Sequence, residues 1–197
     1  MAFGLRVVAV SHEAQFGPFA VAFSGGEYLE LLGLHSSVAA QNAITCVEIA
    51  LQHGDSQRWI TALLRDMNWR PNLVGAVALM LDPTAADAGL LWEAIDRGSW
   101  VVPQVVIATA IVDPRFRERI CTRVETTSSS KLAASGLAMC AEYPDLAAWR
   151  ATRLRDRRVI ALLAEDAGSN NSDGIVRTWL AQLRTVFAER SRIVQLQ

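Results

Sequence analysis

Apolar and polar positions along the chain repeat at a spacing of 31 residues. Each copy consists of a tryptophan, an apolar run and an Asp-Pro dipeptide: Trp69, residues 73–81 and Asp82-Pro83, then Trp100, residues 105–112 and Asp113-Pro114. A weaker third copy places Tyr143-Pro144 behind the small, apolar residues 132–141. Self-similarity at this spacing is typical of stacked supersecondary units. The pattern therefore predicts a repeat architecture and says little about chemistry.

Within these copies the apolar positions follow the three- and four-residue steps of helices. One face of residues 56–67 shows this clearly, with Trp59, Ile60, Leu63, Leu64 and Met67. Asn68 can cap the next helix, and Gly98 can end another. We expect antiparallel helix pairs at about 36–67, 68–98, 99–125 and 130–156, followed by capping helices at about 158–190. The helix near residues 101–112 is apolar nearly all round, which predicts that it lies between other helices.

The first 35 residues break this pattern. Residues 3–10 and 19–23 are short apolar stretches rich in β-branched or aromatic side chains, and Ser24-Gly25-Gly26-Glu27 can form a turn into residues 28–34. We expect a β-hairpin or flap at 1–35 that packs on a helical repeat domain at 36–197. Helix stays the alternative for residues 28–34, because short apolar runs do not discriminate between the two structures.

The charge of the chain argues against a nucleic-acid partner. Its 197 residues contain 19 basic and 20 acidic side chains, a formal net charge of −1, whereas binding to a phosphate backbone rests on many Lys and Arg contacts. The charge is uneven, because residues 1–99 carry five Arg against ten acids and the second half is basic. Such an asymmetry can steer a charged partner toward one end of the molecule.

No residues form a recognisable catalytic or metal-binding motif. The three histidines lack a second ligand at metal-binding spacing, and Cys46, Cys121 and Cys140 form no CxxC pair. We therefore expect no enzyme activity, no metal and no cofactor, with the cysteines as free thiols. The longest apolar run, residues 73–81, is far shorter than the roughly 18 residues that a membrane helix needs, and no signal-peptide pattern is present. We expect a soluble, cytoplasmic protein.

The paired helices with a proline in the turn resemble HEAT-type α-helical repeats over roughly residues 36–156. The resemblance implies a mainly α fold, a short αα-solenoid in which each unit contacts chiefly its neighbours and the stack presents an extended concave face. HEAT repeats are usually longer, and the Asp and Arg that the family often places in its turn and second helix are not regular here. A shorter, irregular solenoid or an ordinary helical bundle therefore stays open.

A repeat scaffold without catalytic residues favours a non-enzymatic protein-binding module. Trp69 and Trp100 start successive units, so we expect them side by side on one rim, where they either stack the units or anchor a partner. Residues 91–100 are similar to small bacterial toxin-immunity proteins. That resemblance implies an inhibitor that neutralises a cognate toxin by direct binding. Its partner-binding residues would be three anchors and four acids that face a basic toxin surface: Trp69, Trp92 and Trp100, with Asp66, Asp87, Glu93 and Asp96.

Two other functions stay open. The arginines between Arg150 and Arg158, around Trp149, form the densest basic cluster of the chain and suit phosphate or base contacts. HEAT-like DNA glycosylases use a basic concave groove, which makes a DNA-binding enzyme the main alternative. A HEAT-like chaperone or lyase for a pigment would need one of the three cysteines to be reactive.

Overall fold

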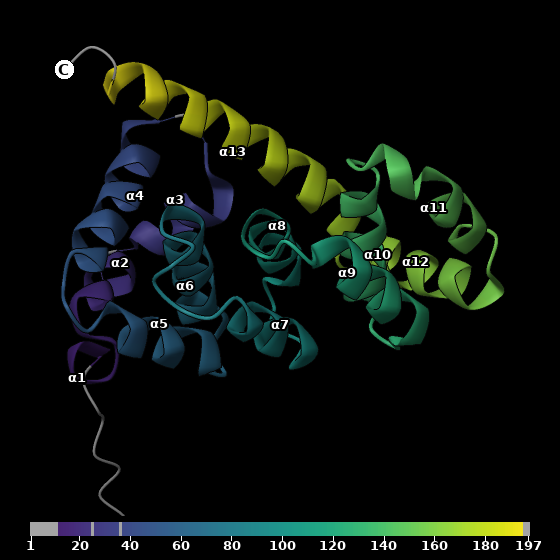
Figure 1. Ribbon diagram of the computed structural model, residues 1–197, viewed down its shortest axis with the longest axis horizontal. Helices are drawn as coiled ribbons and strands as arrows, with labels where there is room; N and C mark the ends of the chain where they lie inside the picture. The colour runs from purple at the N-terminus through teal and green to yellow at the C-terminus, as the bar shows by residue number, and fades with distance from the viewer. Residues whose placement is uncertain (1–11, 25, 36, 195–197) are drawn as a thin grey trace, which may run out of the picture.

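The computed structural model describes residues 12–24, 26–35 and 37–194 (Figure 1), and every regular element in these ranges is a helix. The N-terminal elements are short: α1 (His12–Phe16), the 3-10 turn η1 (Gly17–Ala20), α2 (Val21–Ser24) and α3 (Glu27–Gly33). The central helices are α4 (Val38–Leu51), α5 (Ser56–Arg65), α6 (Trp69–Leu81), α7 (Gly89–Asp96), α8 (Val102–Val112), α9 (Phe116–Thr126) and α10 (Ser130–Cys140). The C-terminal elements are η2 (Pro144–Leu146), α11 (Ala147–Arg153), α12 (Arg157–Ser169) and α13 (Ser172–Val194). The prediction of a mainly helical protein is confirmed.

The strand predicted at residues 19–23 is wrong, because η1 and α2 span them. Residues 28–34 lie mostly in α3, the alternative structure, and residues 3–10 lie outside the described residues. The large buried side chains of this segment form two pairs with a three-residue spacing, as on a helix: Phe16 and Phe19, then Leu31 and Leu34. Gly26 has a φ of 97°, a conformation that is open mainly to glycine. The glycine-rich turn joins the helices α2 and α3 instead of two strands.

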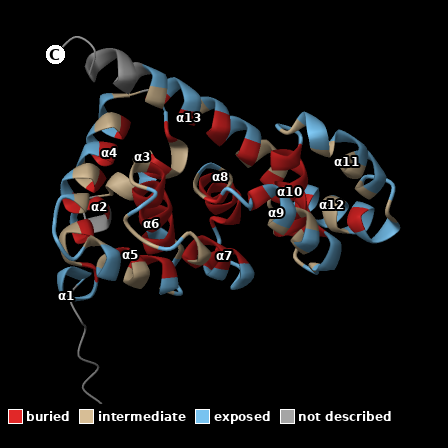
Figure 2. Ribbon diagram, in the orientation of Figure 1, coloured by how far each residue is buried: buried red, intermediate tan, exposed pale blue. Residues whose placement is uncertain are grey.

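The inner helices α6, α8 and α10 form a row in which each helix packs against the next. The outer helices lie along one side of this row, because α5 packs on α6 and α7, α7 packs on α8, and α9 packs on α10. Helix α13 crosses the other side of α8 and α10 (Figure 1). The inner helices are accordingly buried on almost every side (Figure 2). The prediction that the apolar helix near 101–112 lies between other helices is confirmed.

Helix ends follow the polar residues that the sequence places between the apolar runs. Asn68 accepts a hydrogen bond from the Arg70 amide at the start of α6, and Gly98 ends α7 with a φ of 78°. Asp82 and Asp113 each accept a bond from the amide two residues further on. Each Asp-Pro dipeptide is thus a turn between two helices, as expected. No helix in the described part of the chain combines the length and the apolar composition needed to cross a bilayer.

Two arginines connect outer helices to the following units. Arg97 donates to the carbonyl oxygens of Leu64 and Asp66, at the end of α5. Arg158 makes the equivalent contacts at the end of α9, with the carbonyl oxygens of Val124, Glu125 and Thr127. The last carbonyls of a helix have no partner within the helix, and its C-terminal end favours a cation. Each of the two helices is therefore completed by a residue about one repeat later in the chain.

We expect Gly136→Ala to destabilise the protein and Gly168→Ala to stabilise it. A Cβ at Gly136 on α10 would lie 2.7 Å from Val124 Cγ2 and 3.0 Å from Ile120 Cδ1, so α9 and α10 would have to separate. Such overpacking costs about 1–3 kcal/mol, more than the gain of about 0.5–1 kcal/mol from replacing a helical glycine. A Cβ at Gly168 on α12 would meet nothing within 4 Å. Urea unfolding should give opposite signs, and equal signs would contradict the close packing of α9 on α10.

Candidate functional site

An aromatic cluster lies where α6, α8 and α10 begin. Three residues spaced 31 apart meet there: Trp69, Trp100 and Lys131. The ring centroids of Trp69 and Trp100 are 5.0 Å apart, and Lys131 Nζ lies 5.8 Å from the centroid of the Trp100 ring. Tyr28 of α3 extends the cluster, with its ring edge-on to Trp69 at 5.5 Å. We call Tyr28, Trp69, Trp100 and Lys131 the aromatic rim. Trp69 and Trp100 lie side by side, as predicted.

The aromatic rim is partly open to solvent. Trp100 is 57% exposed, whereas Trp69 and Tyr28 are half-buried. The guanidinium carbon of Arg70 lies 5.0 Å from the Tyr28 centroid and 5.6 Å from the Trp69 centroid. Neither Arg70 nor Lys131 has an ion pair with any carboxylate in the described ranges. The rim therefore presents aromatic surface flanked by two cations.

A cleft of about 310 Å³ lies beside Trp100, between the α5–α6 and α7–α8 loops. We call it the rim cleft; its lining includes Asp66, Met67, Asn72, Ser99 and both rim tryptophans. Met67 is 83% exposed. The hydroxyl oxygen of Ser99 is buried and has no hydrogen-bond partner within the described part of the protein. The rim cleft thus combines an exposed apolar side chain with an unused polar atom.

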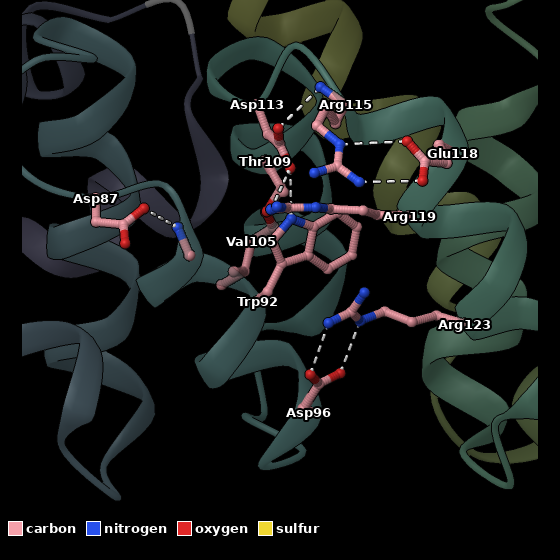
Figure 3. Close-up of polar contacts among 11 residues, drawn as sticks. Asp87, Trp92, Asp96, Val105, Thr109, Asp113, Arg115, Glu118, Arg119 and Arg123 are labelled. Atoms are coloured by element: carbon pink, nitrogen blue, oxygen red, sulfur yellow. Dashed lines mark hydrogen bonds and ion pairs between the residues drawn. The ribbon is translucent and has the colours of Figure 1, made fainter.

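Trp92 lies inside the protein and not at the rim. It is 3% exposed, its ring stacks on Phe116 at 5.8 Å, and Arg123 lies over its other side at 4.2 Å. Its Nε1 donates to Asp113 Oδ2 at 2.7 Å (Figure 3). These contacts join α7 to the turn after α8 and to α9. In this structure Trp92 therefore has a packing role, and it is not available as the surface anchor that the sequence suggested.

The acids predicted to face a basic partner have partners within the protein. Glu93 is bonded to Arg65 of α5, with Nε 3.0 Å from Oε2, and this bond lowers the pKa of Glu93. Asp96 is bonded to Arg123 of α9 through two contacts of 2.9 Å (Figure 3). The two ion pairs tie α7 to the outer helices on both sides of it.

The carboxylates of the other two acids accept hydrogen bonds mainly from backbone amides. Asp87 accepts a bond from the Gly89 amide at the start of α7. Asp66 accepts from the Asn68 amide and from the Gln15 side chain. Of the predicted partner-binding residues, the structure brings Asp66, Trp69 and Trp100 together at the rim cleft and leaves the others on α7 and in the loop before it.

Four contributors to this surface were not predicted: Tyr28, Met67, Arg70 and Lys131. For Lys131 a signal existed, because it stands 31 residues after Trp100 at the start of the third copy. This signal is weak, because the residue type changes from an aromatic ring to a cation. Tyr28 had no such signal, since its contact with Trp69 depends on how α3 packs against α6.

Most of the basic cluster between Arg150 and Arg158 is engaged within the protein. Arg150 Nε donates to the Leu137 carbonyl at 2.9 Å, and Arg153 lies 3.9 Å from acidic oxygens of Glu125 and Asp156. Arg158 completes the end of α9. The cluster therefore offers less free positive charge to a phosphate backbone than its sequence suggests.

Two of the thiols are poorly suited to nucleophilic chemistry. Burial raises the pKa of the Cys140 thiol to about 12 and also raises the pKa of Cys121. The thiolate is the reactive form, so both groups stay protonated near neutral pH. Within the described ranges, no three His, Cys, Asp or Glu side chains are grouped so that they could hold a metal ion.

No protein family, curated protein or solved structure matches the chain. The resemblances to HEAT repeats and to toxin-immunity proteins therefore rest on the sequence alone. The aromatic rim and its cleft are the features from which a function can be argued.

Proposed function

We propose that the protein is a non-enzymatic binding module that holds a partner protein at the aromatic rim. The observation that carries this proposal is Trp100, which is 57% exposed while its ring is held between Trp69 and Lys131. Tryptophan is among the residues most enriched at the centres of protein interfaces. A ring that is already fixed in the free protein loses little conformational entropy when a partner binds. Met67 adds exposed apolar surface beside it.

The charges around the rim favour a partner surface that is apolar and acidic. Arg70 and Lys131 stand at the rim without ion pairs in the described ranges, whereas Glu93 and Asp96 are neutralised by arginines. Electrostatic complementarity governs specificity and the rate of association. We therefore propose carboxylates on the partner opposite Arg70 and Lys131, in place of the basic toxin surface that the four acids suggested.

The packing supports a short, HEAT-like αα-solenoid as the scaffold of this module. Each inner helix contacts the next, and the outer helices follow on one side, as expected when each unit contacts its neighbours. Helix α13 covers the opposite side of α8 and α10. For this reason we place the partner at the rim, at the ends of the inner helices, and not on an open concave face.

In its most specific form, the proposal is a cytoplasmic immunity protein that neutralises a bacterial toxin by direct binding. It rests on the resemblance of residues 91–100 to such proteins and on the rim as the contact surface. A toxin encoded beside this chain should then arrest growth when expressed alone, and co-expression of this chain should restore growth. Trp100→Ala should abolish the protection while leaving the fold intact.

A photo-crosslinking residue placed at Met67 should capture one discrete protein in cells that make this chain. The same residue at Ile160, which is exposed on α12, is the control and should capture none. Adding Trp100→Ala should lower the yield at Met67 at least tenfold, because losing a hot-spot contact of about 2 kcal/mol or more weakens affinity roughly thirtyfold. Arg155→Ala, a surface change on the far unit, should leave the yield unchanged. A yield that does not depend on Trp100 would refute the rim as the binding surface.

A further inference from the structure

Trp100 also lines a second and larger cleft of about 430 Å³, which we call the α13 cleft. Its walls come from the end of α3, the first turns of α8 and α10, the end of α12 with the loop after it, and α13. The residues used below are His35, Trp100, Gln104, Lys131, Ser172 and Trp179. A volume of this size falls in the range of about 300–1,000 Å³ that is typical of small-molecule sites.

The α13 cleft contains a buried amide without a partner. Gln104, in the first turn of α8, is 4% exposed and lines the cleft. Its side chain makes no hydrogen bond within the described part of the chain, and its amide is not among the fully enclosed polar groups, so the amide reaches the surface of the cleft. The neighbouring His35 ring is bonded to Gln182 at 3.1 Å. Buried side-chain amides are nearly always hydrogen-bonded in proteins. Gln104 therefore leaves one donor group and one acceptor group free for a bound molecule.

The electrostatics of the cleft favour an anion. Lys131 is the only Lys, Arg, Asp or Glu among the lining residues, and it has no ion pair within the described ranges. The nearby Glu165 accepts a bond from Ser130 and does not line the cleft. The first turn of α13 contributes Ser172 to the lining, but its positive end is already used, because the buried Asp166 accepts bonds from the Ser172 amide and hydroxyl. Lys131 is therefore the group that favours an anion.

One part of the wall of the α13 cleft is apolar and aromatic, whereas Asn170, Asn171 and Thr178 line another part and are polar. Trp100 contributes an exposed ring, and Trp179 contributes a buried ring whose Nε1 is already bonded to the Leu31 carbonyl. Ile175 and Pro103 complete this surface. A ligand that fits must therefore pair an apolar, preferably planar body with a single acidic group.

We propose that the α13 cleft binds a small organic anion. Its planar apolar body lies against Trp100, and its carboxylate or phosphate group bonds to Lys131 and to the free amide of Gln104. This inference does not rest on the proposed function, because it is argued from Gln104 and the other lining residues of the α13 cleft. The two sites share Trp100 and Lys131, so a bound anion would take up the ammonium group that carboxylates of the protein partner would otherwise meet.

Isothermal titration of the full chain with 2-naphthoate, 2-naphthyl phosphate and neutral 2-naphthamide tests the proposal. At least one of the two anions should bind saturably, and the one that binds more tightly identifies the acidic group. Naphthamide should bind at least tenfold more weakly than that anion. Lys131→Gln should reduce the affinity for the anion about tenfold or more, as expected for a charge-assisted hydrogen bond.

Three further variants separate the site from general charge effects. Gln104→Leu should weaken binding severalfold while the thermal midpoint stays close to that of the wild type or rises, because an unpartnered amide is removed. Lys131→Arg should retain binding. Arg155→Gln removes one positive charge from the loop between α11 and α12, which does not line the cleft. It should change the affinity less than twofold, because salt screens the interaction of distant, exposed charges. The proposal is rejected if neither anion binds saturably at millimolar concentration, if naphthamide binds equally well, or if Lys131→Gln has no effect.

Discussion

Asp113→Ala should lower the free energy of unfolding by about 3–5 kcal/mol, because removing one member of a buried charged group leaves the others without partners. Asp113 is 6% exposed and accepts three bonds: from Trp92 Nε1 at 2.7 Å, from Arg119 Nη1 at 3.0 Å and from the Arg115 amide at 2.9 Å (Figure 3). Its loss would leave the buried indole N–H of Trp92 unsatisfied. The contact between α7, α8 and α9 would weaken as a whole.

The chain provides a matched control one repeat earlier. Asp82 occupies the equivalent Asp-Pro turn, but the bonds that its carboxylate accepts from the amide and hydroxyl of Thr84 are local. Asp82→Ala should therefore cost about 0.5–1.5 kcal/mol, the usual contribution of a local hydrogen bond. Urea unfolding of both variants measures the difference. Equal losses would show that the Trp92–Asp113 contact contributes nothing beyond the turn itself.

The same carboxylate predicts how stability depends on pH. Burial alone would raise the pKa of Asp113, but the bonds from Trp92, from the Arg115 amide and from Arg119 outweigh it and hold the pKa below its usual value. The stabilisation is therefore fully present above the unfolded-state pKa of about 3.9, and it is lost as the pH falls through the lower folded-state pKa. Below about pH 4, the wild type should lose stability more steeply than Asp113→Asn, which has no carboxylate to protonate at this position.

Trp179→Ala should cost about 3–5 kcal/mol, the range for truncating a buried aromatic side chain. Trp179 is 2% exposed, and its Nε1 donates to the Leu31 carbonyl at 3.1 Å across 148 residues of sequence. This hydrogen bond joins α13 to α3, so the loss of the Trp179 side chain should also speed amide hydrogen exchange in both helices. Calorimetry gives the stability, and exchange measured by mass spectrometry locates the change.

Two substitutions serve as controls for Trp179. Trp179→Phe keeps a six-membered ring and loses the hydrogen bond and the volume of the five-membered ring, so it should cost about 1–3 kcal/mol, less than Trp179→Ala. Trp149→Ala removes a half-buried tryptophan whose Nε1 bonds to the exposed Glu125, and its effect should be smaller than that of Trp179→Ala. A larger loss of stability in Trp149→Ala than in Trp179→Ala would contradict the importance of the contact between α13 and α3.

The helical architecture could be predicted because its signals are local. Asn68, Gly98 and the Asp-Pro dipeptides lie next to the helix ends that they determine. The N-terminal segment lacked such signals, and its short apolar runs suited either strand or helix until their packing was known. The helices from α4 onward therefore lie close to the predicted helix pairs, although α7 begins later and α12 and α13 end later than expected, and the elements before α4 differ in kind.

The candidate site could be predicted only in part, because side chains find partners across helices. Nothing near Trp92 in the sequence distinguishes it from Trp100; the difference arises from Phe116 and Arg123 on α9, which cover one and leave the other open. Likewise, the pairing of Glu93 with Arg65 spans 28 residues. A list of acidic residues therefore overestimates the negative charge that a partner would meet.

Helix α13 also limits the number of inner helices that the protein can contain. It packs on α10 and α8 and reaches α3, where Trp179 meets the Leu31 carbonyl. An extra helix inserted into the inner row would lengthen the row by one helix spacing of about 8–10 Å. The hydrogen bond between Trp179 and the Leu31 carbonyl could then not form. Open repeat arrays gain or lose units with little penalty, whereas here the lengths of the inner row and of α13 have to match. Duplication of a unit would have to be accompanied by a longer α13.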